Sequence, residues 1–292
     1  MEAFNGPAKT HNGEGRPKRR GKRGRGMKVS WPEILACSIV IFCLGFMLGR
    51  FSVQSSEYEG LGEPVEIPLN PYDLDSFYYD DDGRLHYDDA AYTSIQVLDV
   101  SYAQKNINWE KVAKDGIDQV IIRLGYRGYK SGLLNLDEYY EQNLKGAKDA
   151  GLDVGVYFFS QAVSVEEARE EAKFVLKQIK GQKIKGPVVF DMEPIKGADR
   201  ITYLTVEEKT AIADAFCDYV EKKGYEAMLY GNPQWLNGDV DLTLLTEHPM
   251  WLAHYTEYTE WPYWYNMWQY TCEGKVSGIK GKVDLSVRII AK

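Results

Sequence analysis

The chain has 292 residues, of which 44% are hydrophobic and 27% charged, a composition typical of a globular protein and not of a disordered chain. This length accommodates one barrel-sized domain with appendages or two ordinary domains. The net charge of −8 is uneven, because residues 1–30 hold nine Lys and Arg side chains and the remainder is acidic. A basic tail alone would suit nucleic-acid binding, but the segment that follows it argues against that partner, and none is expected.

An uncharged apolar run, Ile34–Gly49, follows the basic tail of residues 1–30. With its flanking residues it approaches the roughly 20 residues needed to cross a bilayer, so residues 31–53 are predicted to be a single transmembrane signal anchor. The basic tail predicts a cytoplasmic N-terminus and an extracellular body, and hence a single-pass protein of the cell membrane. A cleaved signal peptide is the alternative, although the charged region is long for one and no Ala-x-Ala-like site follows.

Residues 54–90 are acidic and contain prolines, which predicts a linker that holds the body away from the membrane. One piece of this linker has the pattern of a hairpin. Two aromatic runs, at 77–79 and 85–87, flank an Asp-Gly pair at 82–83, and Asp-Gly between such runs favours a tight turn.

From residue 91 onward, short apolar runs alternate with amphipathic stretches. The periodicity and the capping signals, among them Asn108 and the Ser164/Glu167 and Thr205/Glu208 boxes, predict helices. Predicted helices occupy 108–114 and 137–150 and begin at 164 and 205. Predicted strands occupy 95–99, 120–124, 154–159, 187–192, 227–230, 250–253, 267–271 and 282–285. Such alternation predicts an α/β fold with a parallel sheet, and eight strands favour closure into a TIM-like barrel of about five β/α units plus three further strands over residues 91–292.

The most informative stretch is Pro187–Pro194, where three apolar residues run into Asp191 and Glu193. Side chains at positions i and i+2 of a strand point to the same face, so we expect these two carboxyl groups to lie together. Repulsion and partial burial would separate their pKa values. Cleavage of a glycosidic bond uses such an asymmetric pair of carboxyl groups, one protonated and one ionised.

Polar and aromatic side chains also stand at the ends of the other predicted strands. In a TIM-like barrel these ends converge on one pocket, where the chemistry takes place. A purely structural barrel would not need four carboxylates there. The residues concerned are Asp99, Arg123, Tyr157, Asp191, Glu193, Tyr230, Tyr255, Gln269 and Asp284.

Other chemistries find less support in the sequence. No His/Cys cluster has zinc-binding spacing, no Gly-rich loop has phosphate-binding spacing and no Ser lies in a nucleophile elbow, so neither a metal nor a cofactor is expected. Cys217 and Cys272 lie in the predicted body, and the sequence leaves open whether they pair.

The order of motifs along residues 95–290 is similar to that of glycoside hydrolase family 25, the lysozymes that act as N-acetylmuramidases. The matching motifs are Leu98–Gln104, Ile107–Trp109, Ile121–Arg123, Asp137 with Asn143, Gly155–Phe159, Phe190–Glu193, Leu229–Gly231, Trp251–Tyr255, Trp268–Thr271 and Val283–Asp284. The family fold is a barrel of five β/α units and three further strands.

The resemblance implies hydrolysis of the β-1,4 bond between N-acetylmuramic acid and N-acetylglucosamine in peptidoglycan. It implies that Glu193 is the general acid/base and that Asp191, Asp99 and Asp284 assist. The side chains expected to line the sugar subsites are Arg123, Tyr157, Tyr230, Tyr255 and Gln269. Many members have His where this chain has Phe158, so a group that could hydrogen-bond substrate is missing at this position. The alternative is a non-catalytic glycan-binding module on the same barrel.

Overall fold

The structure, a computed structural model, describes residues 61–195, 197 and 200–292. The predicted basic tail and the predicted anchor at residues 31–53 lie outside the described residues. Within the part that is described, no helix has both the length and the apolar character needed to cross a membrane.

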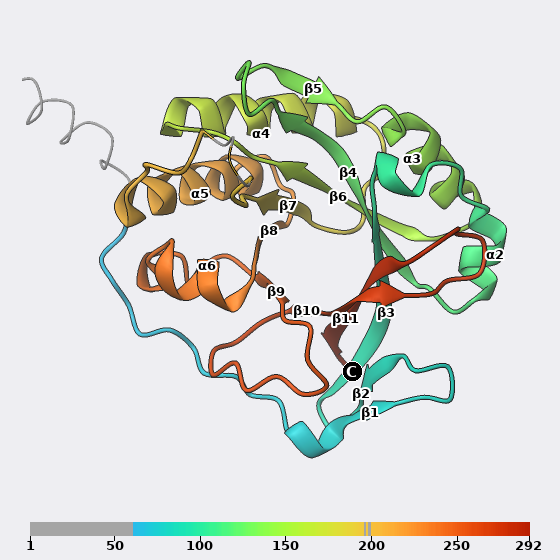
Figure 1. Cartoon of the computed structure of the whole chain (residues 1–292). Helices are drawn as coiled ribbons and strands as arrows, with labels where there is room; N and C mark the ends of the chain where they lie inside the picture. Colours follow the sequence, from blue (N-terminus) through green and yellow to red (C-terminus); the bar gives the residue numbers. More distant parts are fainter. Residues whose placement is uncertain (1–60, 196, 198–199) are drawn as a thin grey trace, which may run out of the picture. The chain divides into compact units, whose positions relative to one another are not determined.

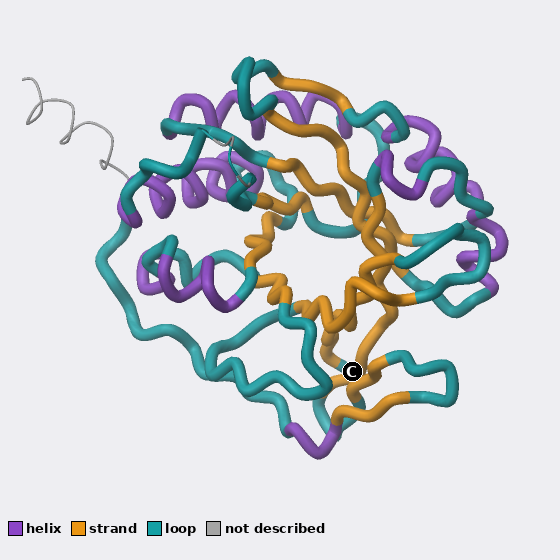
Figure 2. The backbone as a smooth tube through the Cα atoms, viewed as in Figure 1, coloured by secondary structure: helices purple, strands orange, loops and turns teal. Residues whose placement is uncertain are grey.

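Eight strands close into a barrel, as the sequence predicts. Neighbouring strands follow the order β3-β11-β10-β9-β8-β7-β6-β4, and a β3–β4 pairing completes the ring, which Figure 2 shows along its axis. Six of the pairings are parallel, because each crossover connection returns the chain to the same end of the sheet. The strands are β3 (Tyr92–Val100), β4 (Gln119–Arg127), β6 (Asp153–Phe159), β7 (Val188–Asp191), β8 (Ala227–Gly231), β9 (Met250–Ala253), β10 (Met267–Gly274) and β11 (Val283–Ala291).

Helices follow the first five strands on the outside of the barrel (Figure 1). Their starts are capped where the sequence indicates, because the side chains of Asn108, Ser164 and Thr205 each accept a hydrogen bond from a backbone N–H three residues on. No α-helix lies between β9 and β11, so the count of five β/α units plus three strands is confirmed. The helices are α2 (Trp109–Lys114), α3 (Tyr140–Asp149), α4 (Val165–Ile179), α5 (Val206–Glu221) and α6 (Pro233–Gly238).

Alternation along the strands produces two separate apolar cores. The larger core lies between the outer face of the sheet and the helices, and it includes Phe158, Phe190 and Phe216. The smaller core fills the inside of the barrel. Five of its members lie two places before a predicted site residue on the same strand, and Trp251 lies four places before Tyr255. The members are Val97, Ile121, Val189, Met228, Trp251 and Met267. This inner layer forms the floor on which the site is built.

The last strand differs from the sequence-based expectation. We predicted a short strand at 282–285 with Asp284 at its end, whereas β11 runs from Val283 to Ala291, antiparallel to both of its neighbours. Asp284 therefore lies near the start of its strand. Because β11 runs opposite to the parallel strands, its start lies at the same end of the barrel as the ends of those strands. A further short strand that we did not predict, β5 (Leu134–Leu136), pairs antiparallel with β4.

Residues 61–90 belong to the segment predicted as an acidic linker with a possible hairpin, and they pack against the barrel. The hairpin is present. The hairpin of β1 (Phe77–Tyr79) and β2 (Leu85–Tyr87) follows a short 3₁₀ turn, η1 (Leu74–Ser76). Tyr72 donates a hydrogen bond to the carbonyl of Tyr265 at 2.8 Å, and Leu85 is fully buried. Aromatic side chains scattered through the acidic segment supply enough apolar surface to hold it on the barrel.

Candidate active site

A pocket of about 220 Å³ lies at the mouth of the barrel, above the inner apolar layer. It is formed where the parallel strands end and β11 begins. Eight of the nine residues that we predicted for the site lie around it, and Arg123 does not. The lining residues are Asp99, Tyr157, Asp191, Glu193, Tyr230, Trp251, Tyr255, Gln269 and Asp284.

Asp99 and Asp284 reach the pocket from adjacent strands. They are cross-strand partners in the antiparallel β3–β11 ladder. Asp99 lies two residues after Val97, which belongs to the inner core, so the alternation of the strand turns its carboxyl group toward the pocket. Asp99 is buried, whereas Asp284 is half-buried. The two carboxyl groups thus form one wall of the pocket.

Asp191 and Glu193 reach the same pocket from the end of β7. Asp191 is the last residue of the strand and is buried, and Glu193 follows two residues later, beyond the strand, and is half-buried. The Oδ1 atom of Asp191 has no hydrogen-bond partner among the described residues. One deep carboxyl group with an unpaired oxygen therefore lies beside a second group that solvent can reach.

The surroundings raise the pKa of all four carboxyl groups. Burial is the largest cause in each case, because a charged carboxylate loses its hydration. Repulsion adds to it, since Asp284 raises the pKa of Asp99 and of Glu193, and Glu193 raises that of Asp191. The pocket therefore favours protonated carboxyl groups, as a general acid requires.

Gln269 connects three of the lining residues. Its Nε2 donates to Oδ2 of Asp99 at 2.8 Å. Its Oε1 accepts hydrogen bonds from the hydroxyl groups of Tyr230 at 2.9 Å and Tyr255 at 2.8 Å. Gln269 itself is buried, so this amide fixes the orientation of one acid and two aromatic rings at once.

Arg123 is the predicted site residue that does not line the pocket. Its Nε and Nη2 lie 2.8 and 2.7 Å from Oδ2 of buried Asp137, and its guanidinium stacks over the ring of Tyr102 at 4.7 Å. A bulge in the pairing of β4 with β6 begins at Arg123. The charge still acts at a distance, because Arg123 opposes the rise in the pKa of Asp191.

Trp251 lines the pocket although we did not name it as a site residue. It lies on β9 within one of the matching motifs, and its Nε1 donates to the hydroxyl group of Ser286 at 3.0 Å. The position of Trp251 beside Tyr230 in the β8–β9 register could have identified it. Phe158, the position at which the chain departs from the family resemblance, is fully buried beside Phe174 and is not part of the pocket lining.

Neither a cluster of side chains that could bind a metal ion nor a cysteine is found among the described residues that line the pocket. Among residues 61–195, 197 and 200–292, no group of three or more His, Cys, Asp or Glu side chains is placed to hold a metal ion. Cys217 is free and buried on α5, and Cys272 is free and exposed on β10. The side chains that line the pocket carry carboxyl, amide, phenol and indole groups.

Comparison with known proteins gives one family match and several relatives. The sequence model of glycosyl hydrolases family 25 matches residues 98–279. An uncharacterized protein, YegX of Escherichia coli K12, is 28% identical over 203 residues, which are 68% of this chain and 70% of YegX. An autolytic lysozyme of Clostridium acetobutylicum is 25% identical over 189 residues, which are 64% of this chain and 54% of that lysozyme.

Solved structures with the same fold include the modular autolysin LytC of Streptococcus pneumoniae in complex with a synthetic peptidoglycan ligand. That structure has a TM-score of 0.61 and 24% identity and covers 76% of this chain, which in turn spans only 52% of the LytC chain. A family 25 glycosyl hydrolase from Bacillus anthracis has a TM-score of 0.56 and 22% identity, and the match covers 66% of this chain and 88% of that one.

Proposed function

Because the chain belongs to glycosyl hydrolases family 25, we propose that it hydrolyses the β-1,4 bond between N-acetylmuramic acid and N-acetylglucosamine in peptidoglycan. The observation that carries this proposal is the meeting of four carboxyl groups with raised pKa in one pocket. The names of relatives support it, since one is called an autolytic lysozyme and one autolysin structure contains a peptidoglycan ligand.

In this proposal Glu193 is the general acid/base. It is the less buried member of the pair at the end of β7, so an entering glycosidic oxygen can reach it. Its raised pKa keeps the proton that bond cleavage requires at the leaving oxygen. The same carboxylate then takes a proton from the water that completes hydrolysis.

Asp191 has the role of the assisting carboxyl group. Its unpaired Oδ1 can orient the acetamido group of the substrate or stabilise positive charge at the sugar ring. Asp284, on the wall that it forms with Asp99, helps to keep Glu193 protonated through its negative charge. Tyr157, Tyr230 and Tyr255 offer aromatic surfaces for the sugar rings.

The test is digestion of purified peptidoglycan by the wild-type chain and by Glu193→Gln, followed by mass spectrometry of the products. We expect muramic acid at the new reducing ends, and a loss of rate of at least 10²-fold in the variant. Glu247→Gln, at an exposed position, is the matched control. An inactive wild type that still binds the wall would instead indicate a non-catalytic glycan-binding module.

We also propose that residues 31–53 anchor the hydrolase in the cell membrane with its barrel outside the cell. The uncharged run and the preceding basic residues support this. The full chain should stay with the membrane pellet after an alkaline carbonate wash, and added protease should digest the barrel in intact spheroplasts. Release by the wash, or a mature chain that begins after the apolar run, would contradict the proposal.

A further inference from the structure

The end of β7 is held by the segment that follows β6. Within the barrel, backbone hydrogen bonds hold β7 as far as Asp191, whose carbonyl accepts a bond from the N–H of Ser160 at 2.7 Å. Glu193 lies beyond the strand, where the ladder no longer holds the backbone. The side chain of Gln161 takes over there, because its Nε2 donates to the carbonyl oxygen of Glu193 at 3.0 Å.

The other end of the Gln161 amide holds the same loop at a second point. Its Oε1 accepts a hydrogen bond from the N–H of Arg200 at 3.1 Å. One side chain therefore bridges the backbone at Glu193 and at Arg200, on either side of the segment between them. Gln161 is fully buried, so water does not compete for these bonds.

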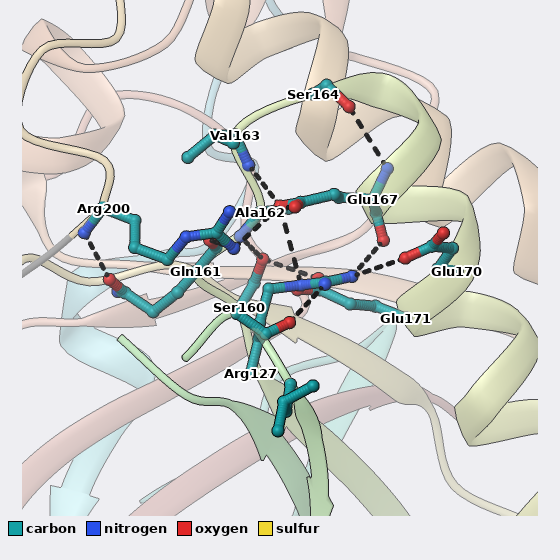
Figure 3. Close-up of polar contacts among 12 residues, drawn as sticks. Arg127, Ser160, Gln161, Ala162, Val163, Ser164, Glu167, Glu170, Glu171 and Arg200 are labelled. Carbon is teal, nitrogen blue, oxygen red and sulfur yellow. Dashed lines mark hydrogen bonds and ion pairs between the residues drawn. The ribbon is translucent and has the colours of Figure 1, made fainter. Parts of the chain in front are cut away.

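Arg200 closes the arrangement with its side chain (Figure 3). Its Nη1 donates to the carbonyl of Gln161 at 3.1 Å, and its guanidinium forms two 2.9 Å contacts with the carboxylate of Glu167 on α4. Glu167 in turn accepts a bond from the N–H of Val163 at 3.0 Å. The predicted capping box is thus only half formed, because Glu167 serves this network and not the N–H of Ser164.

We propose that Gln161 is a positioning residue that fixes the backbone of Glu193 and thereby aims its carboxyl group at the scissile bond. The inference rests on the proposed role of Glu193 as general acid/base. The physical reason is that proton transfer depends steeply on geometry, so a misplacement of about 1 Å can cost roughly 10²-fold in rate. Neither Gln161 nor Arg200 lines the pocket, so neither would touch the reacting atoms.

Two variants of Gln161 distinguish the contributions of its hydrogen bonds to Glu193 and to Arg200. Gln161→Met keeps the length of the side chain and removes both bonds. Gln161→Glu keeps the acceptor for Arg200 but, when ionised, cannot donate to Glu193. We expect kcat to fall about 10–10²-fold in both variants at neutral pH. We expect KM to change less than threefold, because the sugar-binding surfaces are not touched.

The dependence of the rate on pH distinguishes a positioning role of Gln161 from a merely structural one. A buried carboxyl group stays protonated to higher pH than an exposed one, and a protonated carboxyl group can donate a hydrogen bond. The rate of Gln161→Glu relative to wild type should therefore recover as the pH falls. The relative rate of Gln161→Met should stay low across the same range.

The positioning role of Gln161 is tested against one control variant and against four contrary outcomes. Gln178→Met, on α4 and outside the network, should retain the wild-type rate. Wild-type kcat in Gln161→Met, or a raised KM with unchanged kcat, would overturn the positioning role while leaving the hydrolase proposal intact. An inactive wild type would remove both. Failure of both variants to fold, judged by circular dichroism, would also overturn it by assigning Gln161 to stability.

Discussion

Asp99 and Asp284 face each other directly across the β3–β11 ladder, one near the end of its strand and the other near the start. Like charges at directly opposed positions destabilise a sheet. Burial makes the cost larger, since both pKa values are raised first by desolvation. The barrel retains this unfavourable pair at the mouth of its pocket. Replacing either carboxyl group by an amide should therefore have a measurable effect.

Asp284→Asn should shift the pH dependence of activity. Burial and the negative charge of Asp284 raise the pKa of Glu193, so removing that charge lets Glu193 lose its proton at lower pH. The alkaline limb of a kcat/KM profile should therefore move to lower pH. Asp81→Asn, in the exposed turn of the hairpin, should leave the profile in place. An unchanged or alkaline-shifted limb would show that the two groups do not interact.

Asp99→Asn should stabilise the fold at neutral pH and reduce activity. The raised pKa of Asp99 means that its contribution to stability is present at low pH and is lost as the pH rises through the folded value. The neutral amide keeps an acceptor for Gln269 and removes the repulsion. Tm should rise by about 2–4 °C for each kcal/mol regained in a domain of this size.

Thermal scans from acid to mildly alkaline pH check this prediction for Asp99. The wild type should lose more stability on this rise in pH than the variant does. Parallel curves would mean that the buried carboxyl group is compensated elsewhere.

Gln269→Met should cost both rate and stability. The change removes the donor to Asp99 and the acceptor of the hydroxyl groups of Tyr230 and Tyr255. Leaving buried polar groups unpaired costs about 1–3 kcal/mol. Urea unfolding and steady-state kinetics measure the two effects, with Gln178→Met as the control. A variant as stable as wild type would show that water replaces the amide.

Arg127→Met should be the most destabilising of these changes. The guanidinium is buried against Glu171, which is fully buried, with Nε–Oε1 at 2.7 Å. Burial already raises the pKa of Glu171 to about 7. Removal of one partner from such a buried pair costs about 3–5 kcal/mol. Urea unfolding should show this loss, whereas Arg169→Met, on the exposed face of α4, should lie within about 0.5 kcal/mol of wild type.

The sequence predicts most of the barrel because its signals are local. Strand and helix periods and capping residues repeat along the chain, and they place β6, β7, β8 and β9 within one residue of their observed bounds. The meeting of Asp99, Asp191 and Glu193 follows from the rule that parallel strands end at one mouth, whereas Asp284 reaches that mouth from the start of antiparallel β11. The direction of β11 could not be predicted this way, because a run of apolar residues does not reveal the orientation of its strand.

The parts that the sequence does not predict depend on contacts between distant residues. Arg123 was expected among the sugar subsites, but it turns to Asp137 because the loop after β4 brings that carboxylate within reach. Gln161 has no local signal, since its role depends on where the loop after β7 passes. The hairpin segment is acidic in composition, yet its aromatic side chains decide its packing.

The antiparallel course of β11 also decides how the protein could be handled in the laboratory. The N–H of Lys292 bonds to the carbonyl of Ala91 at 3.0 Å, so the entry to β3 and the exit of β11 meet. Seven register steps separate the Tyr92–Ala291 pair from the Asp99–Asp284 pair, a distance of about 23 Å. A bead, fluorophore or fusion partner coupled at Lys292 would therefore sit at the far end of the ring and leave the mouth that holds the pocket unobstructed.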